Sequence, residues 1–294
     1  MISGPFRGSE AIARGVLTRG QLRSARYRRI LPDIYVHADD RIDLRLRSRA
    51  AFLMVARRGG VLAGYSAAEL LGAHCAPANA PAEVLVGYDV RAHPGLLVHR
   101  GSPGPGDVCG AGGCRVTSPE RTAWDLARRL DLVEAVVAVD ALAGRFAPRD
   151  LLARRARTPG ARGCRCLDKV VELADPRSES PMETRLRLLL VLAGLPVPEV
   201  QFPVRNAAGV VLARFDLAYP EAMLAIEYDG ELHLSPNGRV RDRERDVDTA
   251  LRGWHTLRFG KRDVLAAPQR TVRVVAQVRA QRLAAEFDSR ARNS

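Results

Sequence analysis

Apolar residues in the first half of the chain recur with helical spacing over one long stretch and with strand spacing over shorter runs. Residues 43–57 carry apolar side chains at intervals that predict a helix. Two short apolar runs, 83–86 and 96–99, predict strands. The glycine- and proline-rich stretch 101–113 is expected to be a loop. Helices are expected at about 120–130, 132–142 and 148–157.

The opening segment has the pattern of two short helices and a hairpin. Ser9 is placed to cap a helix over residues 10–14, and Thr18 to cap a second over 19–25. Residues 27–30 and 33–36 then predict two strands around a turn at Pro32-Asp33. Helix, turn, helix and hairpin form the layout of a winged helix-turn-helix.

Three arginines of this segment are candidates for DNA contact. Arg19, Arg23 and Arg26 lie on or directly after the second predicted helix. In a helix-turn-helix such side chains meet phosphates or base edges. The alternative is a small basic helical cap with no role in nucleic-acid binding.

The chain divides into two predicted domains. The polar, proline-containing run 175–180 separates two different hydrophobic patterns, so we place a boundary between residues 1–177 and 178–294. After it come a helix, three strands, a helix, a strand and a helix. This order predicts an α/β fold, with a C-terminal mixed sheet flanked by helices behind an α+β N-terminal region. The later elements are expected at 181–193, 200–204, 210–217, 223–226, 239–251, 254–259 and 264–287.

An acidic hairpin at 213–233 is the strongest candidate for chemistry. Asp216 lies before the turn Pro220-Glu221, and the apolar strand after the turn ends in Glu227 and Asp229. Burying an unpaired carboxylate is costly, so such groups are usually paired or bound to a cation. If the strands pair, the acids fall near one sheet edge, and oxygen ligands of this kind suit Mg²⁺. The alternative is a surface hairpin with solvated acids.

Further side chains of the second domain join this candidate site. Glu183, on the preceding helix, adds a fourth acid, although at the third helical position it also fits a capping role. His233 follows the hairpin and is a candidate general acid or base, or a surface histidine. Arg241 and Arg245 on the charged helix are candidates for contact with the substrate backbone, and a solvated helix face is the alternative.

Net charge narrows the class of partner. The formal net charge is +13, which favours a polyanionic partner, nucleic acid before an acidic membrane surface. Nearly all of the positively charged side chains are arginines, because lysine occurs only at positions 169 and 261. Arginine binds phosphate through a bidentate fork that lysine lacks.

Cysteine usage and hydropathy predict a cytoplasmic protein that does not span a membrane. Five cysteines in a chain of 294 residues form no paired zinc pattern, and we interpret them as free thiols of a reducing compartment. The N-terminus has no apolar signal region, and no run of 18 apolar residues occurs.

The second half resembles the endonuclease-like family related to very-short-patch-repair endonucleases, within the PD-(D/E)XK, restriction-endonuclease-like superfamily. The resemblance covers roughly residues 178–282. It rests on Pro181-x-Glu183, Phe215-Asp216-x-Ala218-Tyr219-Pro220, Ile226-Glu227-Tyr228-Asp229-Gly230-x-x-His233, Arg245-Asp246 and Gly253-Trp254-x-x-Leu257-Arg258-Phe259.

That resemblance implies an endonuclease dependent on Mg²⁺ or Mn²⁺. It implies Asp216 and Glu227 as metal ligands, the backbone carbonyl of Tyr228 as a third, and Glu183 as the helix acid. The chain departs from the superfamily in one respect: Asp229 stands where the lysine that activates water is usual. Asp229 or His233 would have to replace it, or activity is weak or lost.

The first half resembles the AbiEi type of winged-helix antitoxin. The resemblance rests on the opening helices, on residues 64–72 (GYSAAELLG) and on residues 116–127 (VTSPERTAWDLA). It implies DNA binding and autoregulation beside a toxin gene. Two hypotheses follow: a metal-dependent DNA endonuclease, or a non-catalytic DNA-binding regulator or antitoxin with a degenerate nuclease domain. The partner protein that the two resemblances imply is a toxin or a repair protein.

Overall fold

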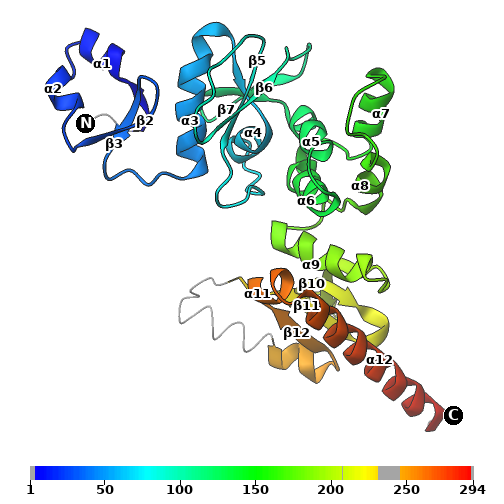
Figure 1. The fold of residues 1–294 in the computed structure, drawn as a ribbon. Helices are drawn as coiled ribbons and strands as arrows, with labels where there is room; N and C mark the ends of the chain where they lie inside the picture. Colours follow the sequence, from blue (N-terminus) through cyan, green and yellow to red (C-terminus); the bar gives the residue numbers. More distant parts are fainter. Residues whose placement is uncertain (1–3, 207, 231–245, 293–294) are drawn as a thin grey trace. The chain divides into compact units, whose positions relative to one another are not determined.

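The computed structural model describes residues 4–206, 208–230 and 246–292, and the side chains up to residue 285. The chain forms two compact units, Met1–Glu172 and Leu173–Ser294. Both units combine helices with sheets, which confirms the predicted α/β class (Figure 1).

The N-terminal segment of the first unit has the predicted order of helices and hairpin. Its elements are β1 (Phe6–Arg7), α1 (Gly8–Ala13), α2 (Arg19–Leu22), β2 (Tyr27–Leu31) and β3 (Ile34–His37). The strands form an antiparallel sheet in the order β1-β3-β2.

The ends of these two helices were only partly predicted. Thr18 caps α2 in a capping box with Gln21, as expected. Helix α2 is shorter than predicted, because the Ser24 hydroxyl donates to the carbonyl of Gln21 and the chain turns away. The prediction that Ser9 caps α1 is wrong: its amide and hydroxyl both donate to the Asp33 carboxylate across the hairpin turn.

Helix α3 (Leu44–Val55) is shared by the two sheets of the first unit. Asp43 caps it by accepting from the amide of Leu46, 2.8 Å away. The helix contacts all three strands of the N-terminal sheet and also β4, β5 and β8 of the larger sheet. The Arg7 guanidinium strengthens this packing by donating to the carbonyl of Leu53. The N-terminal segment is therefore anchored to α3.

The larger sheet has five strands in the order β6-β5-β4-β8-β7. They are β4 (Val61–Leu62), β5 (Ala82–Val86), β6 (Leu96–Arg100), β7 (Val108–Ala111) and β8 (Cys114–Thr117). The prediction of a continuous loop over 101–113 is wrong, because β7 lies inside it and pairs with β8. Gly112 and Gly113 form the turn between them with φ of 55° and 77°, which few other residues adopt at low cost.

Helices complete the first unit. The short connector η1 (Ala56–Arg58) follows α3, and α4 follows β4. The remaining elements are α4 (Gly64–Leu70), α5 (Pro119–Ala127), α6 (Leu132–Leu142), η2 (Ala143–Arg145), α7 (Asp150–Arg157) and α8 (Leu167–Leu173). Ser118 caps α5 with Pro119 at its first position, as the sequence predicts.

A buried carboxylate lies at the start of α4. Glu83, on β5, accepts from the amide of Tyr65 at 2.8 Å and pairs with Nε2 of His99 at 2.6 Å. Gly64 has a φ of 50°, and a Cβ at this position would overlap the Glu83 carboxylate. The absence of a side chain at Gly64 thus makes room for the acid, whose backbone amide donates to the Ser66 hydroxyl.

The second unit has the predicted order of elements. It contains α9 (Pro181–Leu192), β9 (Glu199–Arg205), β10 (Val211–Tyr219), η3 (Pro220–Ala222), β11 (Leu224–Tyr228), helical residues 246–251, β12 (His255–Phe259), α11 (Lys261–Leu265) and α12 (Pro268–Arg292). The predicted helix 239–251 lies partly outside the described residues. The single helix expected from Val264 is wrong, since the chain breaks before Pro268 into α11 and α12.

The sheet of this unit is mixed, with the strand order β12-β11-β10-β9. Strands β9, β10 and β11 are antiparallel, whereas β11 and β12 are parallel. Its core joins apolar residues of the sheet, among them Leu217, Ile226 and Phe259, to side chains of α9, α11 and α12. The hairpin β10–β11 thus lies at the centre of the sheet.

Candidate nucleic-acid interface

The most basic face of the N-terminal segment surrounds α2. Arg19 opens this helix, Arg23 ends it, and Arg26 lies in the turn before β2; all three side chains are exposed. Among the described residues, no carboxylate forms an ion pair with any of them. The capping box at Thr18 fixes the start of α2, so Arg19 leaves the helix from a defined position.

A shallow groove of about 420 Å³ runs between α1, α2 and the hairpin. Arg19 and Arg23 line one side, and Tyr35 of β3 contributes to the other. Asp33 also lines the groove, but Ser9 holds its carboxylate through two hydrogen bonds of 2.8 and 2.6 Å. The groove therefore presents two guanidinium groups beside one acid that is already bound.

This arrangement suits a phosphate backbone. A guanidinium offers paired donors that match a phosphate, and exposure leaves those donors available. Side chains at the start of the second helix of a helix-turn-helix are also the ones that approach base edges. The predicted DNA-contact residues Arg19, Arg23 and Arg26 are thus all exposed, and the first two line one groove. Arg241 and Arg245, the other two, lie outside the described residues.

The strand register of the second unit makes Asp216 and Glu227 cross-strand neighbours. The antiparallel ladder ends at the pair Leu217 with Ile226, and Asp216 and Glu227 are the residues directly beyond this pair on the two strands. Residues directly opposite in such a ladder project to the same face of the sheet. Oδ2 of Asp216 accepts a hydrogen bond of 2.8 Å from the amide of Tyr228.

Arg258 occupies the space beside Glu227. It lies opposite Glu227 in the parallel register of β11 and β12, and its Nε donates to the Glu227 carboxylate at 3.1 Å. Its Nη2 donates to Asp246 at 2.5 Å. Burial acts to lower the pKa of Arg258, but the hydrogen bond with Asp246 and the charge of Glu227 outweigh it and raise that pKa. Glu227 is only 7% exposed. Arg258 lies directly beside its carboxylate, where the resemblance implies a metal ion.

The remaining acids of the candidate site have separate surroundings. The amide of Glu183 donates to the Ser180 hydroxyl, and its carboxylate accepts from the amide of Glu179 at 2.9 Å and from the side chain of Gln201 at 2.8 Å. Asp229 is exposed at the end of β11, where its amide donates to the carbonyl of Phe259. His233 lies outside the described residues.

A bound metal ion finds no ready site in this arrangement. Across the residues that the structure describes, no group of three or more His, Cys, Asp or Glu side chains is close enough to hold one. The oxygen chemistry of Asp216 and Glu227 suits Mg²⁺. However, protein donors already bind both carboxylates, with the amide of Tyr228 at one and Arg258 at the other.

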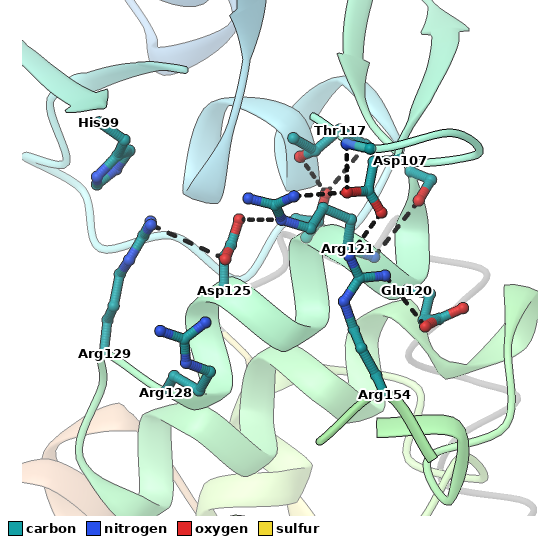
Figure 2. Close-up of polar contacts among 12 residues, drawn as sticks. His99, Asp107, Thr117, Glu120, Arg121, Asp125, Arg128, Arg129 and Arg154 are labelled. Atoms are coloured by element: carbon teal, nitrogen blue, oxygen red, sulfur yellow. Dashed lines mark hydrogen bonds and ion pairs between the residues drawn. The ribbon is translucent and has the colours of Figure 1, made fainter. Parts of the chain in front are cut away.

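A buried ionic network in the first unit was not predicted from the sequence. Asp107 accepts from Nη1 of Arg121 and from Nη2 of Arg154, both at 2.6 Å (Figure 2). Arg121 also donates through Nε to Asp125 at 2.8 Å, and Arg154 to Glu120 at 3.2 Å. The network joins the segment before β7 to α5 and α7.

Both charges at the centre of this network are stabilised in their ionised forms. Burial alone would raise the pKa of Asp107, but hydrogen bonds from Arg154, the Gly104 amide and Arg121 lower it below its ordinary value. Burial would lower the pKa of Arg121, and Asp125 and Asp107 raise it instead. The spacing of four between Arg121 and Asp125 was the available sequence signal. Asp107 gave none, because it lies in the stretch predicted to be loop.

Comparison with known proteins gives one family match and two similar chains. Residues 50–188 match the AbiEi antitoxin C-terminal domain family. An uncharacterized protein of Mycobacterium tuberculosis strain CDC 1551/Oshkosh is 30% identical over 225 residues, which cover 70% of this chain and 82% of that protein. An uncharacterized protein of strain ATCC 25618/H37Rv matches with the same identity and coverage. No solved structure gives a significant match.

These matches agree with the AbiEi resemblance of the first half and add nothing on the nuclease resemblance of the second. Within the described ranges, no helix is long and apolar enough to cross a bilayer. The two mycobacterial proteins match this chain over most of its length and over most of their own. The chain belongs to the family of these mycobacterial proteins, with an AbiEi antitoxin C-terminal domain matched over residues 50–188.

Proposed function

We propose that the protein is a DNA-binding regulator of the antitoxin type, which contacts DNA through residues 6–37. The observation that carries this proposal is the exposed arginine face of α2, where Arg19, Arg23 and Arg26 have no carboxylate partner among the described residues. The AbiEi match supports it, since the domain that follows this segment is of an antitoxin family. The net charge of +13 supports a polyanionic partner.

The mechanism follows from the geometry of the segment. The capped start of α2 fixes the position of Arg19, and the β2–β3 hairpin adds two further exposed arginines, Arg28 and Arg29. Phosphate contacts of this kind fix the position of a protein on DNA, and residues of α2 then read base edges. Because α3 contacts the N-terminal sheet, the segment is held in place before DNA arrives.

The test is binding to the DNA upstream of the protein's own gene. We expect a gel shift that weakens steeply with salt, because each phosphate contact releases counterions. Arg19→Gln with Arg23→Gln should raise Kd about tenfold or more, if each guanidinium contributes roughly 1 kcal/mol. A double variant of two exposed arginines elsewhere, Arg91→Gln with Arg165→Gln, is the matched control. Equal binding by both double variants would refute the assignment of the contact to α2.

The AbiEi match also supports a protein partner for the matched domain, namely a toxin. The five cysteines are free thiols, which accords with the cytoplasm as the site of action. Co-expression with the product of the adjacent gene tests the proposal of a toxin partner. We expect relief of any growth arrest that this product causes, and relief that survives Arg19→Gln would separate neutralisation from DNA binding.

A metal-dependent DNA endonuclease in the second unit is the second candidate. The observation that favours it is the register that makes Asp216 and Glu227 neighbours on one face of the sheet. Mg²⁺ or Mn²⁺ would need these carboxylates and the Tyr228 carbonyl, as the resemblance implies. The described arrangement does not fit that ion while Arg258 holds Glu227.

Plasmid nicking with Mg²⁺ or Mn²⁺ tests this candidate. Asp216→Ala should abolish any nicking, because the variant lacks the carboxylate that the resemblance makes the principal ligand. Nicking by the variant at the wild-type rate would assign the activity to a contaminant. Gel-shift binding that persists in Asp216→Ala, without cleavage by either protein, would favour the regulator.

A further inference from the structure

A second set of exposed arginines lies along α3, outside the helix-turn-helix. Arg45 and Arg49 are four residues apart on the helix, and Arg41 lies four residues earlier, just before it begins. All three are exposed. A rise of 1.5 Å per residue separates Arg45 from Arg49 by about 6 Å along one face. The buried residues of the helix, Leu44, Ser48, Ala50, Ala51 and Val55, lie on its other sides.

No acidic side chain balances these charges. Helix α3 contains no Asp or Glu, and the three acids just before it have other partners. Asp43 is the N-cap, Asp40 accepts from the amide of His37 at 3.0 Å, and Asp39 lies 3.4 Å from the His37 ring. Within the described residues, no carboxylate forms an ion pair with Arg41, Arg45 or Arg49. Arg47, in contrast, is turned inward and donates to the carbonyl of Ala80 at 3.0 Å.

The position of these arginines is unfavourable for the isolated helix. Arg45 lies in the first turn of α3, where the helix dipole favours negative charge and disfavours a cation. A bound phosphate offsets this penalty, because it is attracted by the guanidinium groups.

The α3 arginines continue the basic surface of the hairpin. Arg28 on β2 donates to the carbonyl of Asp40 at 2.7 Å, so its guanidinium lies on the turn that leads to Arg41. At the other end, the guanidinium of Arg45 lies beside the Gly112 turn between β7 and β8. The charges therefore extend from the hairpin along α3 to the five-stranded sheet.

We propose that Arg41, Arg45 and Arg49 form a second phosphate-contact surface, which binds the DNA backbone beside the site held by α2. This inference rests on the proposed DNA-binding function and extends it into the region where the AbiEi match begins. The surface contributes affinity and salt dependence without sequence information, since phosphate contacts read no bases.

The salt dependence of DNA affinity tests the proposal. The probe is a random-sequence duplex of about 30 base pairs, or roughly three helical turns, and binding is followed by fluorescence anisotropy. Arg45→Gln with Arg49→Gln should weaken binding and reduce the slope of log K against log salt by about 2, or one for each phosphate that the variant no longer neutralises. Arg91→Gln with Arg165→Gln removes the same charge elsewhere in the first unit and should leave the slope nearly unchanged.

Lysine variants and thermal unfolding separate charge from packing. Arg45→Lys with Arg49→Lys should keep most of the wild-type slope, because a point charge still pairs with phosphate. Both double variants should unfold near the wild-type temperature, since the side chains are exposed. A lysine variant as weak as the glutamine variant would assign the effect to packing and overturn the proposal.

The outcomes distinguish this inference from the proposed function. If wild-type protein binds no DNA, the proposed function and this inference both fail. If wild-type protein binds and Arg19→Gln with Arg23→Gln weakens it, but the α3 variant equals its control, only this inference fails. The α3 arginines would then face an acidic protein surface instead.

Discussion

Arginines of the first unit fall into two groups that differ in burial and partners. Arg19, Arg23 and Arg26 are exposed around α2 and have no acidic partner among the described residues. Arg121 and Arg154 have side chains that are 16% exposed, and they share the Asp107 carboxylate at 2.6 Å each. Arginine side chains thus contact solvent in the first group, whereas those of the second group join helices.

The difference between the groups teaches which charges hold the fold. Removing one partner of a buried pair leaves the other desolvated and unpaired, whereas exposed pairs contribute little. The role of an arginine in this protein therefore cannot be interpreted from its charge alone. The burial of the acid beside each arginine decides between a structural and a binding role, and this comparison can be tested by the size of each loss.

The largest effect is expected at Arg121. Arg121→Met should lower the free energy of unfolding by about 3 kcal/mol, because it removes the cation that the buried Asp107 and Asp125 share. The loss is at the lower end for a broken buried pair, since Arg154 remains on Asp107 and Arg129 lies 3.9 Å from Asp125. Chemical denaturation measures the change. Arg91→Met serves as the exposed control, and a loss of the same size there would remove the distinction between the two groups.

The next effect is a dependence of stability on pH. The pKa of Asp107 is lowered in the folded state, so its contribution is present above the ordinary carboxyl pKa of about 3.9 and is lost as pH falls towards the folded value. Thermal unfolding between about pH 2 and 6 should show a drop in Tm below about pH 4. Asp107→Asn should show a smaller drop, because it has no carboxyl to protonate there.

A smaller effect is expected for the exposed group. Arg19→Gln with Arg23→Gln should change the free energy of unfolding by no more than about 0.5 kcal/mol, while it weakens DNA binding. The same denaturation series measures the first quantity. A loss of unfolding free energy comparable to that of Arg121→Met would mean that these side chains stabilise the N-terminal segment and are not a ligand-binding surface.

The smallest effect is expected at Arg155, on α7. It forms a two-bond pair with Asp168 on α8, at 2.6 and 3.0 Å, but both groups are exposed to solvent. Hydrogen bonding to Asp168 raises the pKa of Arg155, yet water screens the pair. Arg155→Gln should leave Tm unchanged within error, and a clear decrease would show that burial is a poor guide to the role of an arginine here.

Local signals predicted much of the fold. The caps at Thr18 and Ser118 mark helix starts because a side-chain oxygen satisfies an amide within three residues. The order of elements in the second unit followed from alternation and turn residues. Strand β7 was missed because its four residues include a glycine and lie between glycine-rich turns, so no apolar alternation was visible.

Contacts between distant residues were harder to predict. The neighbours Asp216 and Glu227 are joined by one short turn, so their register was accessible from the hairpin alone. Arg258 reaches Glu227 only through a parallel strand 31 residues later, and Arg154 reaches Asp107 from 47 residues away. Such pairs depend on how layers pack, which the local pattern does not encode.

The contact between Gly64 and Glu83 limits the substitutions that relatives of this chain can carry at these two positions. Any residue larger than glycine at position 64 would collide with the acid from β5, and loss of the acid would leave His99 and the Tyr65 amide without this acceptor. Neither substitution is tolerable by itself, so the two sites should change only as a pair. A relative with alanine at the first position should also carry a shorter side chain at the second.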